Sequence, residues 1–285
     1  MVLIKKNIDR GEYGVSRWPV FYANNPADII RSLVATTRIS DIRKQFMNPE
    51  SSSLDAQPGI EDGAYLLDGV IRTAEGKTSK LLRDQMKIFA KNRFMFAFFD
   101  DQTNLIDAAT GYAHWVDGVL TETPIANQDG TVEGLSFEIA MKSSANGFTQ
   151  IVRDMPAVNG GTYDLDEVWN TLSNAQTAFD GLWQLQSRHV EGALCSDFNE
   201  MKLIGGGHFI FFQRFDSEGE TIKHFGFGAL QVEKSGMVIE TAMTSTLDSY
   251  SGKNHLLNIT LIDTDHMTQT FMLNGAEVVQ SYVRI

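Results

Sequence analysis

The feature of this sequence that most constrains its fold is an internal duplication. Two stretches of about 105 residues match each other at an offset that stays between 115 and 119. The matched pairs include Gly63 with Gly181, Met86-Lys87 with Met201-Lys202, Phe99-Asp100 with Phe215-Asp216, Gly111 with Gly226, Glu122-Thr123 with Glu240-Thr241, and Thr149-Gln150 with Thr268-Gln269. The small drifts in offset fall near turn residues, as loop-length changes between two copies of one fold would produce. The duplication therefore predicts two tandem domains of the same fold.

Both copies have the pattern of short strands separated by turns. Strand-like stretches are broken every 8–14 positions by turn signals such as Asp129-Gly130 and Asn274-Gly275. Each copy has room for roughly eight strands, and eight strands closed as an up-and-down barrel enclose side chains or one small ligand. The sequence thus predicts a mainly β protein with two tandem antiparallel eight-stranded barrels, at residues 63–170 and 178–285.

The second copy resembles a lipocalin-like domain. It carries Gly181-Leu182-Trp183 on its first predicted strand and Arg284 on its last. In the lipocalin superfamily a first-strand G-x-W tryptophan packs under a basic residue from the end of the barrel, and a guanidinium on an indole is a favourable cation–π contact. The first copy departs from this pattern, because Tyr65 stands in place of the tryptophan. The chain is similar to tandem lipocalin-like (calycin-type) proteins of bacteria, which are largely uncharacterised.

This resemblance implies that one or both barrels bind a small apolar or aromatic molecule. The second copy keeps the G-x-W feature and five of the six His residues, so we expect a polar-anchored ligand there first. The alternative is a lipocalin-fold enzyme of the cyclase, isomerase or hydratase type, in which a cavity positions a small apolar metabolite and one acid or base moves the proton. A purely structural or protein-binding role is a third interpretation.

Residues 1–62 form an extension of different composition. They hold eight Lys and Arg against eight Asp and Glu, whereas the rest of the chain holds 16 against 28 and accounts for the net charge of −12. Asn25 and Pro26 can begin a helix whose apolar residues recur at helical spacing, so we expect a helix over about 25–46 and then a polar linker. Such a helix is typical of packing or homodimerisation, with a basic membrane-surface helix as the alternative.

Composition excludes several classes of protein. An apolar fraction of 42% excludes intrinsic disorder, and the single Cys195 excludes a disulfide framework. No apolar run approaches the ~18–20 residues of a membrane helix. The acidic balance argues against nucleic acid as a partner. No signal peptide is visible, so we expect a cytoplasmic location by default, and a secreted or periplasmic one if a leader has been removed.

Phenylalanine is concentrated in two short windows. Nine of the 18 Phe residues fall in 88–99 and 207–215, and both faces of these strands are apolar. We therefore expect one face to line a barrel interior and the other to meet the second barrel or the N-terminal helix, with core packing alone as the alternative interpretation. A homodimer contact through these strands is a further expectation. The predicted ligand-lining residues are Phe94, Phe96, Phe98, Tyr112, Phe209, Phe211 and Phe227.

Four titratable residues are candidates for acid–base chemistry: His208, His114, Glu122 and Glu240. Either histidine could place one polar group in an apolar pocket, although a surface or hydrogen-bonded core histidine is the commoner case. The two glutamates match between the copies, but Met243 lies on the face opposite Glu240. We therefore favour a cross-strand pair on the barrel exterior for both glutamates. No His, Cys or carboxylate spacing indicates a metal or cofactor site.

Overall fold

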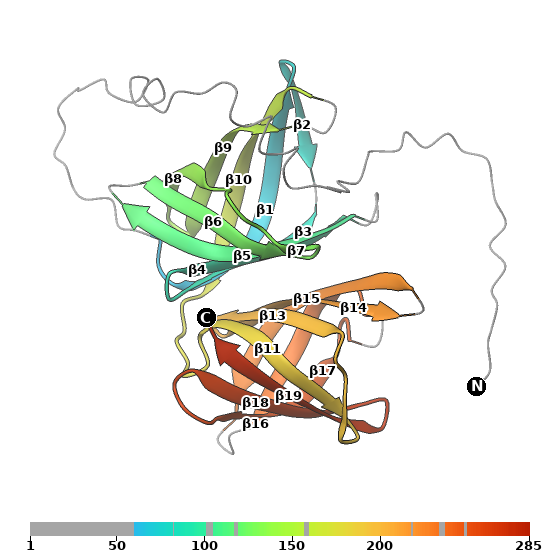
Figure 1. Cartoon of the computed structure of the whole chain (residues 1–285). Coiled ribbons are helices and arrows are strands. Elements are labelled where there is room, and N and C mark those ends of the chain that lie inside the picture. The colour runs from blue at the N-terminus through green and yellow to red at the C-terminus, as the bar shows by residue number, and fades with distance from the viewer. Residues whose placement is uncertain are drawn as a thin grey trace. The chain divides into compact units, whose positions relative to one another are not determined.

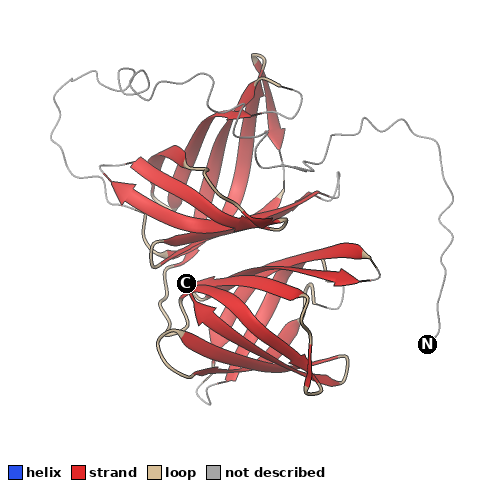
Figure 2. Ribbon diagram, viewed as in Figure 1, coloured by secondary structure: helices blue, strands red, loops and turns tan. Residues whose placement is uncertain are grey.

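The computed structural model describes residues 60–81, 83–100, 105–116, 119–156, 160–217, 219–233, 237–247 and 250–285. The predicted helix over 25–46 lies outside these residues. Within them the regular elements are strands (Figure 2). None of the described residues forms a helix that is long and apolar enough to cross a bilayer.

Barrel 1 is a closed antiparallel barrel of eight main strands. They are β1 (Gly63–Ala74), β3 (Asp84–Ala90), β4 (Arg93–Asp100), β5 (Leu105–Val116), β6 (Val119–Asn127), β8 (Phe137–Ser144), β9 (Gly147–Pro156) and β10 (Thr162–Ser173). Each strand pairs with the next, and β10 pairs back with β1 to close the barrel (Figure 1). The short strands β2 (Lys77–Leu81) and β7 (Gly130–Thr131) pair with β1 and β6.

Barrel 2 repeats this arrangement. Its main strands are β11 (Gly181–Val190), β13 (Phe198–Gly205), β14 (His208–Ser217), β15 (Glu220–Val232), β16 (Met237–Ser245), β17 (Asn254–Leu261), β18 (His266–Leu273) and β19 (Ala276–Arg284). Pairing of β11 with β19 closes the barrel, and the short β12 (Ala193–Leu194) pairs with β11. Both barrels belong to one compact unit. The predicted tandem of eight-stranded antiparallel barrels is therefore confirmed.

The structural alignment of the two barrels corrects the sequence match at one glycine. Gly111 and Gly228, not Gly226, each adjoin a shift in strand register. A Cβ at Gly111 would lie 2.1 Å from the carbonyl oxygen of Thr123, and a Cβ at Gly228 would lie 2.0 Å from that of Thr241. Glycine is needed at both positions because two backbones approach closely beside a bulge.

The aromatic strands β4 and β14 are buried on both faces, as predicted. Phe94 belongs to the interior cluster of barrel 1, and Phe209 belongs to that of barrel 2. On the opposite faces, Met95 and Phe212 belong to a third cluster, which contains residues of both barrels. The second face of each aromatic strand therefore meets the other barrel.

The turn between β13 and β14 also approaches barrel 1 closely. Gly206 has a φ of +62°, and a Cβ there would lie 2.4 Å from both the amide nitrogen of Ala64 and the carbonyl oxygen of Ser173. We expect Gly206→Ala to lower the free energy of unfolding by about 1–3 kcal/mol, measured by urea denaturation. Gly219→Ala is the matched control, since φ there is +84° and no atom lies within 4 Å of the added Cβ. Equal losses in the two variants would contradict a tight contact at Gly206.

Candidate functional site

The lipocalin-type contact expected in barrel 2 is present. The guanidinium of Arg284 lies 4.3 Å from the ring centroid of Trp183, and the indole is fully buried. The indole Nε1 of Trp183 donates a hydrogen bond of 2.8 Å to the carbonyl oxygen of Phe179. In barrel 1 the hydroxyl of Tyr65 donates to the carbonyl oxygen of Glu61 at 2.7 Å, so the tyrosine keeps the equivalent hydrogen bond.

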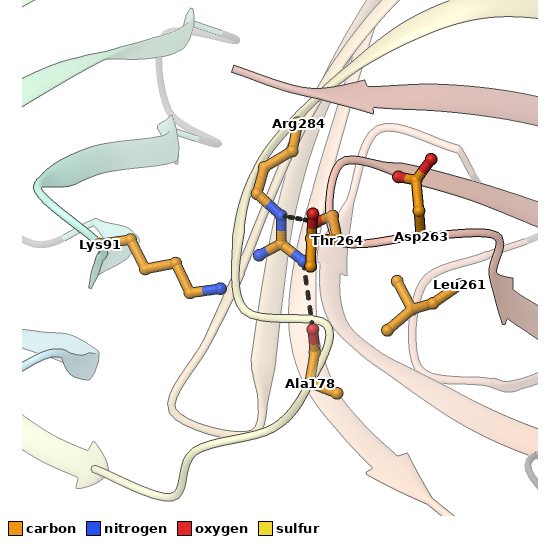
Figure 3. A pocket seen from close by; sticks show the side chains of 6 residues that line it. All are labelled: Lys91, Ala178, Leu261, Asp263, Thr264 and Arg284. Carbon is orange, nitrogen blue, oxygen red and sulfur yellow. Dashed lines mark hydrogen bonds between the residues drawn. The ribbon is translucent and has the colours of Figure 1, made fainter.

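Arg284 also lines a surface pocket of about 470 Å³ (Figure 3). Its Nε donates to the carbonyl oxygen of Thr264 at 2.7 Å, and its Nη2 donates to that of Ala178 at 3.2 Å. Lys91 points toward this guanidinium; burial and then the positive charge of Arg284 lower the pKa of Lys91. The N–H groups of Arg284 already donate to backbone carbonyl oxygens, so they are not available to a ligand in this pocket. We therefore assign the pocket to the Trp–Arg contact and not to a binding site.

The interior of each barrel contains a layer of buried polar side chains between apolar ones. We define polar layer 1 as Lys87, Glu122, Gln150 and Glu167, and polar layer 2 as Lys202, Glu240, Gln269 and Gln280, all at most 5% exposed. The matching members lie on equivalent strands, and their neighbours two positions away are interior core residues, such as Phe89 beside Lys87 and Val238 beside Glu240. Strand alternation therefore places all eight side chains inside the barrels.

Polar layer 2 is part of one continuous chain of hydrogen bonds. Lys202 Nζ donates to Glu240 Oε1 and, at 3.0 Å, to Gln269 Oε1. Gln269 donates to Gln280 at 3.1 Å, and Gln280 donates to Glu200 at 3.2 Å. Hydroxyl groups complete both ends of the chain, because Tyr250 donates to Glu240 Oε2 and Tyr282 donates to Glu200 Oε1 at 2.7 Å. Buried polar groups that are fully paired in this way stabilise one core arrangement.

Polar layer 1 is divided into two sets. Lys87 Nζ lies 2.5 Å from Glu122 Oε1 and donates to Gln150 Oε1 at 2.9 Å. Glu167 accepts hydrogen bonds from Arg83 at 3.1 Å and from the indole of Trp169 at 3.3 Å. Among the described residues, Lys87 is the one partner of the Glu122 carboxylate. Within the described part of the chain, Glu122 therefore has no second donor of the kind that Tyr250 supplies to Glu240.

Burial shifts the pKa values of these groups. Desolvation raises the pKa of Glu122 above its ordinary 4.5, although the positive charge of Lys87 partly opposes the shift. Desolvation, followed by the charge of Glu240, raises the pKa of Tyr250 well above 10. The hydroxyl of Tyr250 therefore stays protonated and donates a hydrogen bond to the carboxylate of Glu240. Glu122 is thus a carboxylate whose charged form is destabilised by burial and only partly stabilised by Lys87.

The raised pKa of Glu122 predicts a specific pH dependence. From about pH 4.5 up to the folded-state pKa, the folded protein binds more protons at Glu122 than the unfolded chain, so this group makes stability fall as pH rises through that range. Glu122→Gln removes the titration, and the variant should gain stability relative to wild type as pH rises. Urea unfolding at several pH values between about 4 and 8 measures this difference. The exposed Glu138→Gln is the control, and a Glu122→Gln profile parallel to wild type would contradict the shift.

The placement of Glu122 and Glu240 corrects the expectation that they lie on the barrel exterior. Glu240 is 1% exposed in the inward row of β16, whereas Met243 on the outer row is 45% exposed. The outer row of β16 is itself apolar, and for this reason the sequence pattern indicated the outer face as the interior one. The glutamates can be buried because Lys87 and Lys202, from strands distant in sequence, bring the opposite charge to them.

The other predicted site residues divide between interior and exterior positions. Phe94, Phe96 and Phe98 share the inward face of β4, and Phe209 and Phe211 lie inside barrel 2. Two predicted ligand-lining residues lie elsewhere: Phe227 is in the cluster shared by the barrels, and Tyr112 is 46% exposed beneath Arg93.

Neither candidate histidine points into the interior of its barrel, where the candidate glutamates Glu122 and Glu240 lie. His114 is exposed, on the same outer face of β5 as Tyr112. The Nδ1 of His208 lies 2.8 Å from the carbonyl oxygen of Gly206, on the face of β14 that carries Ile210 and Phe212. The preference for barrel 2 rested partly on its histidines, and His208, the candidate among them, does not support it.

Sequence reasoning missed the two lysines and Tyr250. Lys87 and Lys202 match at the offset of 115, and each lies directly between two apolar residues, which was the available signal. Tyr250 lies in the loop between β16 and β17, and nothing in the sequence around it indicates that its side chain enters the barrel.

Among the described residues, no group of three or more His, Cys, Asp or Glu side chains is arranged to hold a metal ion. A second surface pocket, of about 400 Å³, is lined by polar residues of barrel 2 such as Asp197 and Asp216. Neither described pocket is lined by a member of the polar layers. The polar layers themselves are therefore the candidate site that is inside the barrels.

The fold and the buried polar layers define a protein with two closed eight-stranded antiparallel barrels, an arrangement that fits a tandem lipocalin-like fold. No protein-family model matches the sequence, and no curated protein matches it either. A similar solved structure is that of a DUF3598-family protein of unknown function from Nostoc punctiforme PCC 73102, with 12% identity over 78% of this chain and 96% of that one. Its TM-score is 0.24, so we infer nothing about this chain from it.

Proposed function

We propose that this protein binds a small apolar or aromatic molecule inside barrel 1. The observation that carries the proposal is Glu122, a carboxylate 5% exposed whose one partner among the described residues is Lys87. Phe94 and Phe96 on β4 supply an apolar wall in the same interior. An apolar interior with a few placed polar groups is how small-ligand sites are generally built.

The comparison with barrel 2 favours barrel 1 as the site. In barrel 2 every member of the polar layer has partners within the chain, and Leu230 lies opposite Glu240 in the strand pair. In barrel 1 the smaller Ala113 lies opposite Glu122. At this level barrel 2 therefore has the larger side chain, and barrel 1 has the smaller one together with a carboxylate that has fewer partners among the described residues.

Native mass spectrometry of the purified protein is the first test. We expect a co-purifying small molecule that is released on mild denaturation, or a rise in melting temperature with members of a panel of apolar and aromatic compounds. Ala113→Leu introduces the barrel 2 residue and should weaken binding by at least about tenfold, because it fills the space opposite Glu122. Val116→Leu, at a position 52% exposed on the same strand, should bind as wild type does. Absence of any bound mass and of any thermal shift would overturn the proposal.

The second candidate function is an acid–base enzyme of the isomerase, cyclase or hydratase type. The observation that favours it is the raised pKa of Glu122 beside the ammonium group of Lys87, a pair that could hold and move one proton. The ligand recovered from the protein decides between the two functions. Conversion of that compound by wild type but not by Glu122→Gln would establish catalysis, and its recovery unchanged from both would leave binding alone.

A further inference from the structure

Barrel 2 contains an internal phenol at the level of its polar layer. The hydroxyl of Tyr250 donates to Glu240 Oε2. Its ring packs edge-on against two aromatic residues of β14, with centroid distances of 6.4 Å to Phe209 and 5.7 Å to Phe211. A side chain from the β16–β17 loop thus links the carboxylate of Glu240 to the aromatic wall of the barrel.

Barrel 1 has the same wall and the same carboxylate in the same register. Phe94 pairs with Gly111 as Phe209 pairs with Gly228, and Glu122 pairs with Ala113 as Glu240 pairs with Leu230. The pairs Phe94–Phe96 and Phe209–Phe211 are stacked in the same way, at 6.5 and 6.2 Å. The aromatic wall and the carboxylate that contact Tyr250 are therefore repeated in barrel 1. His255, which pairs with Glu240 and stacks on Tyr250 at 3.8 Å, is replaced there by Phe137, which pairs with Glu122.

The described part of barrel 1 contains no counterpart of Tyr250. Its residues place no other ring against Phe94 or Phe96 and no hydroxyl against Glu122. Phe96 is only partly buried, whereas its equivalent Phe211, under Tyr250, is 6% exposed. Among the described residues of barrel 1, no ring or hydroxyl therefore takes the position that Tyr250 takes in barrel 2.

We propose that the ligand of barrel 1 is a small phenol, whose hydroxyl donates to Glu122 and whose ring packs edge-on against Phe94 and Phe96. This inference rests on the proposed function and names its ligand class. A hydrogen bond from a hydroxyl to a buried carboxylate is charge-assisted and short, and it would give Glu122 a donor in addition to Lys87, its one partner in the described part of the chain. A carboxylic acid would place a second negative charge beside Glu122, and a hydrocarbon of the same shape would add no donor to the one that Lys87 supplies.

Calorimetric titration of the full chain with three probes of similar shape tests the ligand class. We expect p-cresol to bind at least about tenfold more tightly than toluene, and 4-methylbenzoate to bind more weakly than either. Glu122→Gln should reduce the preference for p-cresol over toluene by about tenfold or more, because a neutral amide is a weaker acceptor. The exposed Glu138→Gln on β8 is the matched control and should keep the wild-type preference.

The outcomes of this titration separate the two proposals. Equal affinities for p-cresol and toluene would overturn the phenol class and leave the binding function intact. Failure of all three probes to bind, together with no response to the wider panel, would overturn both.

A second experiment uses barrel 2 to test the equivalence directly. Tyr250→Ala removes the internal phenol, so p-cresol should raise the melting temperature of this variant more than that of wild type, and the number of molecules bound per chain should rise from one to two. Tyr250→Phe keeps the ring and should bind no second molecule. If Tyr250→Ala folds but binds no additional p-cresol, the comparison between the two barrels is wrong; if it does not fold, the Glu122→Gln titration alone decides.

Discussion

Replacing Lys202 by methionine will lower the free energy of unfolding by about 3–5 kcal/mol. The lysine side chain is 2% exposed, and its ammonium group pairs with Glu240 and Gln269. Methionine preserves most of the aliphatic stem, so packing changes little. The carboxylate of Glu240, however, would remain buried with Tyr250 as its one donor among the described residues, and an uncompensated buried charge accounts for most of the loss. Urea denaturation at neutral pH measures it.

Two further variants test that explanation. Lys202→Met combined with Glu240→Gln removes both charges and should recover part of the loss, because the glutamine can still accept from Tyr250. Lys223→Met is the matched control, since the ion pair of Lys223 with Asp129 is partly exposed and should contribute less than about 1 kcal/mol. Similar losses for Lys202→Met and Lys223→Met would show that burial of the Lys202 pair is not what makes it important.

Trp183→Ala will also destabilise the protein by about 3–5 kcal/mol. The indole is fully buried, its Nε1 donates to the carbonyl oxygen of Phe179, and it lies beneath the guanidinium of Arg284. The alanine variant would leave a large cavity, an unpaired carbonyl and an unstacked cation. Thermal and urea unfolding of the full chain measure the combined loss.

The natural substitution at this position supplies the control. Barrel 1 carries Tyr65 in place of the tryptophan, and its hydroxyl makes the equivalent hydrogen bond to Glu61. Trp183→Tyr should therefore lose less than half as much stability as Trp183→Ala. A loss of less than about 1.5 kcal/mol for the alanine variant would contradict a structural role for the buried indole.

Much of the fold could be predicted because its determinants are local or repeated. The alternation along β4 and β14 shows two apolar faces, and the structure uses both, with Phe94 and Phe209 inside the barrels and Met95 and Phe212 between them. The contact between Trp183 and Arg284 was expected from the resemblance to lipocalin-like domains, and the structure contains it.

The candidate site could be predicted only in part. Glu122 and Glu240 were identified from their match between the copies, but their face was not, because Met243 and its neighbours make the outside of β16 apolar too. Tyr112 and Phe227 were expected inside because they are aromatic, and both face away from the interiors. Aromatic character does not determine the face when both faces of a strand can be buried.

The sequence by itself determined the duplication, the strand periodicity and the aromatic strands, since these depend on residue order along one stretch of chain. The tertiary structure decided which carboxylates are buried and what accompanies them. Lys202 reaches Glu240 from a strand 38 residues away, and Tyr250 reaches it from a loop. A charge can be buried only where an opposite charge or a donor meets it in space, and that meeting is set by closure of the barrel rather than by local sequence.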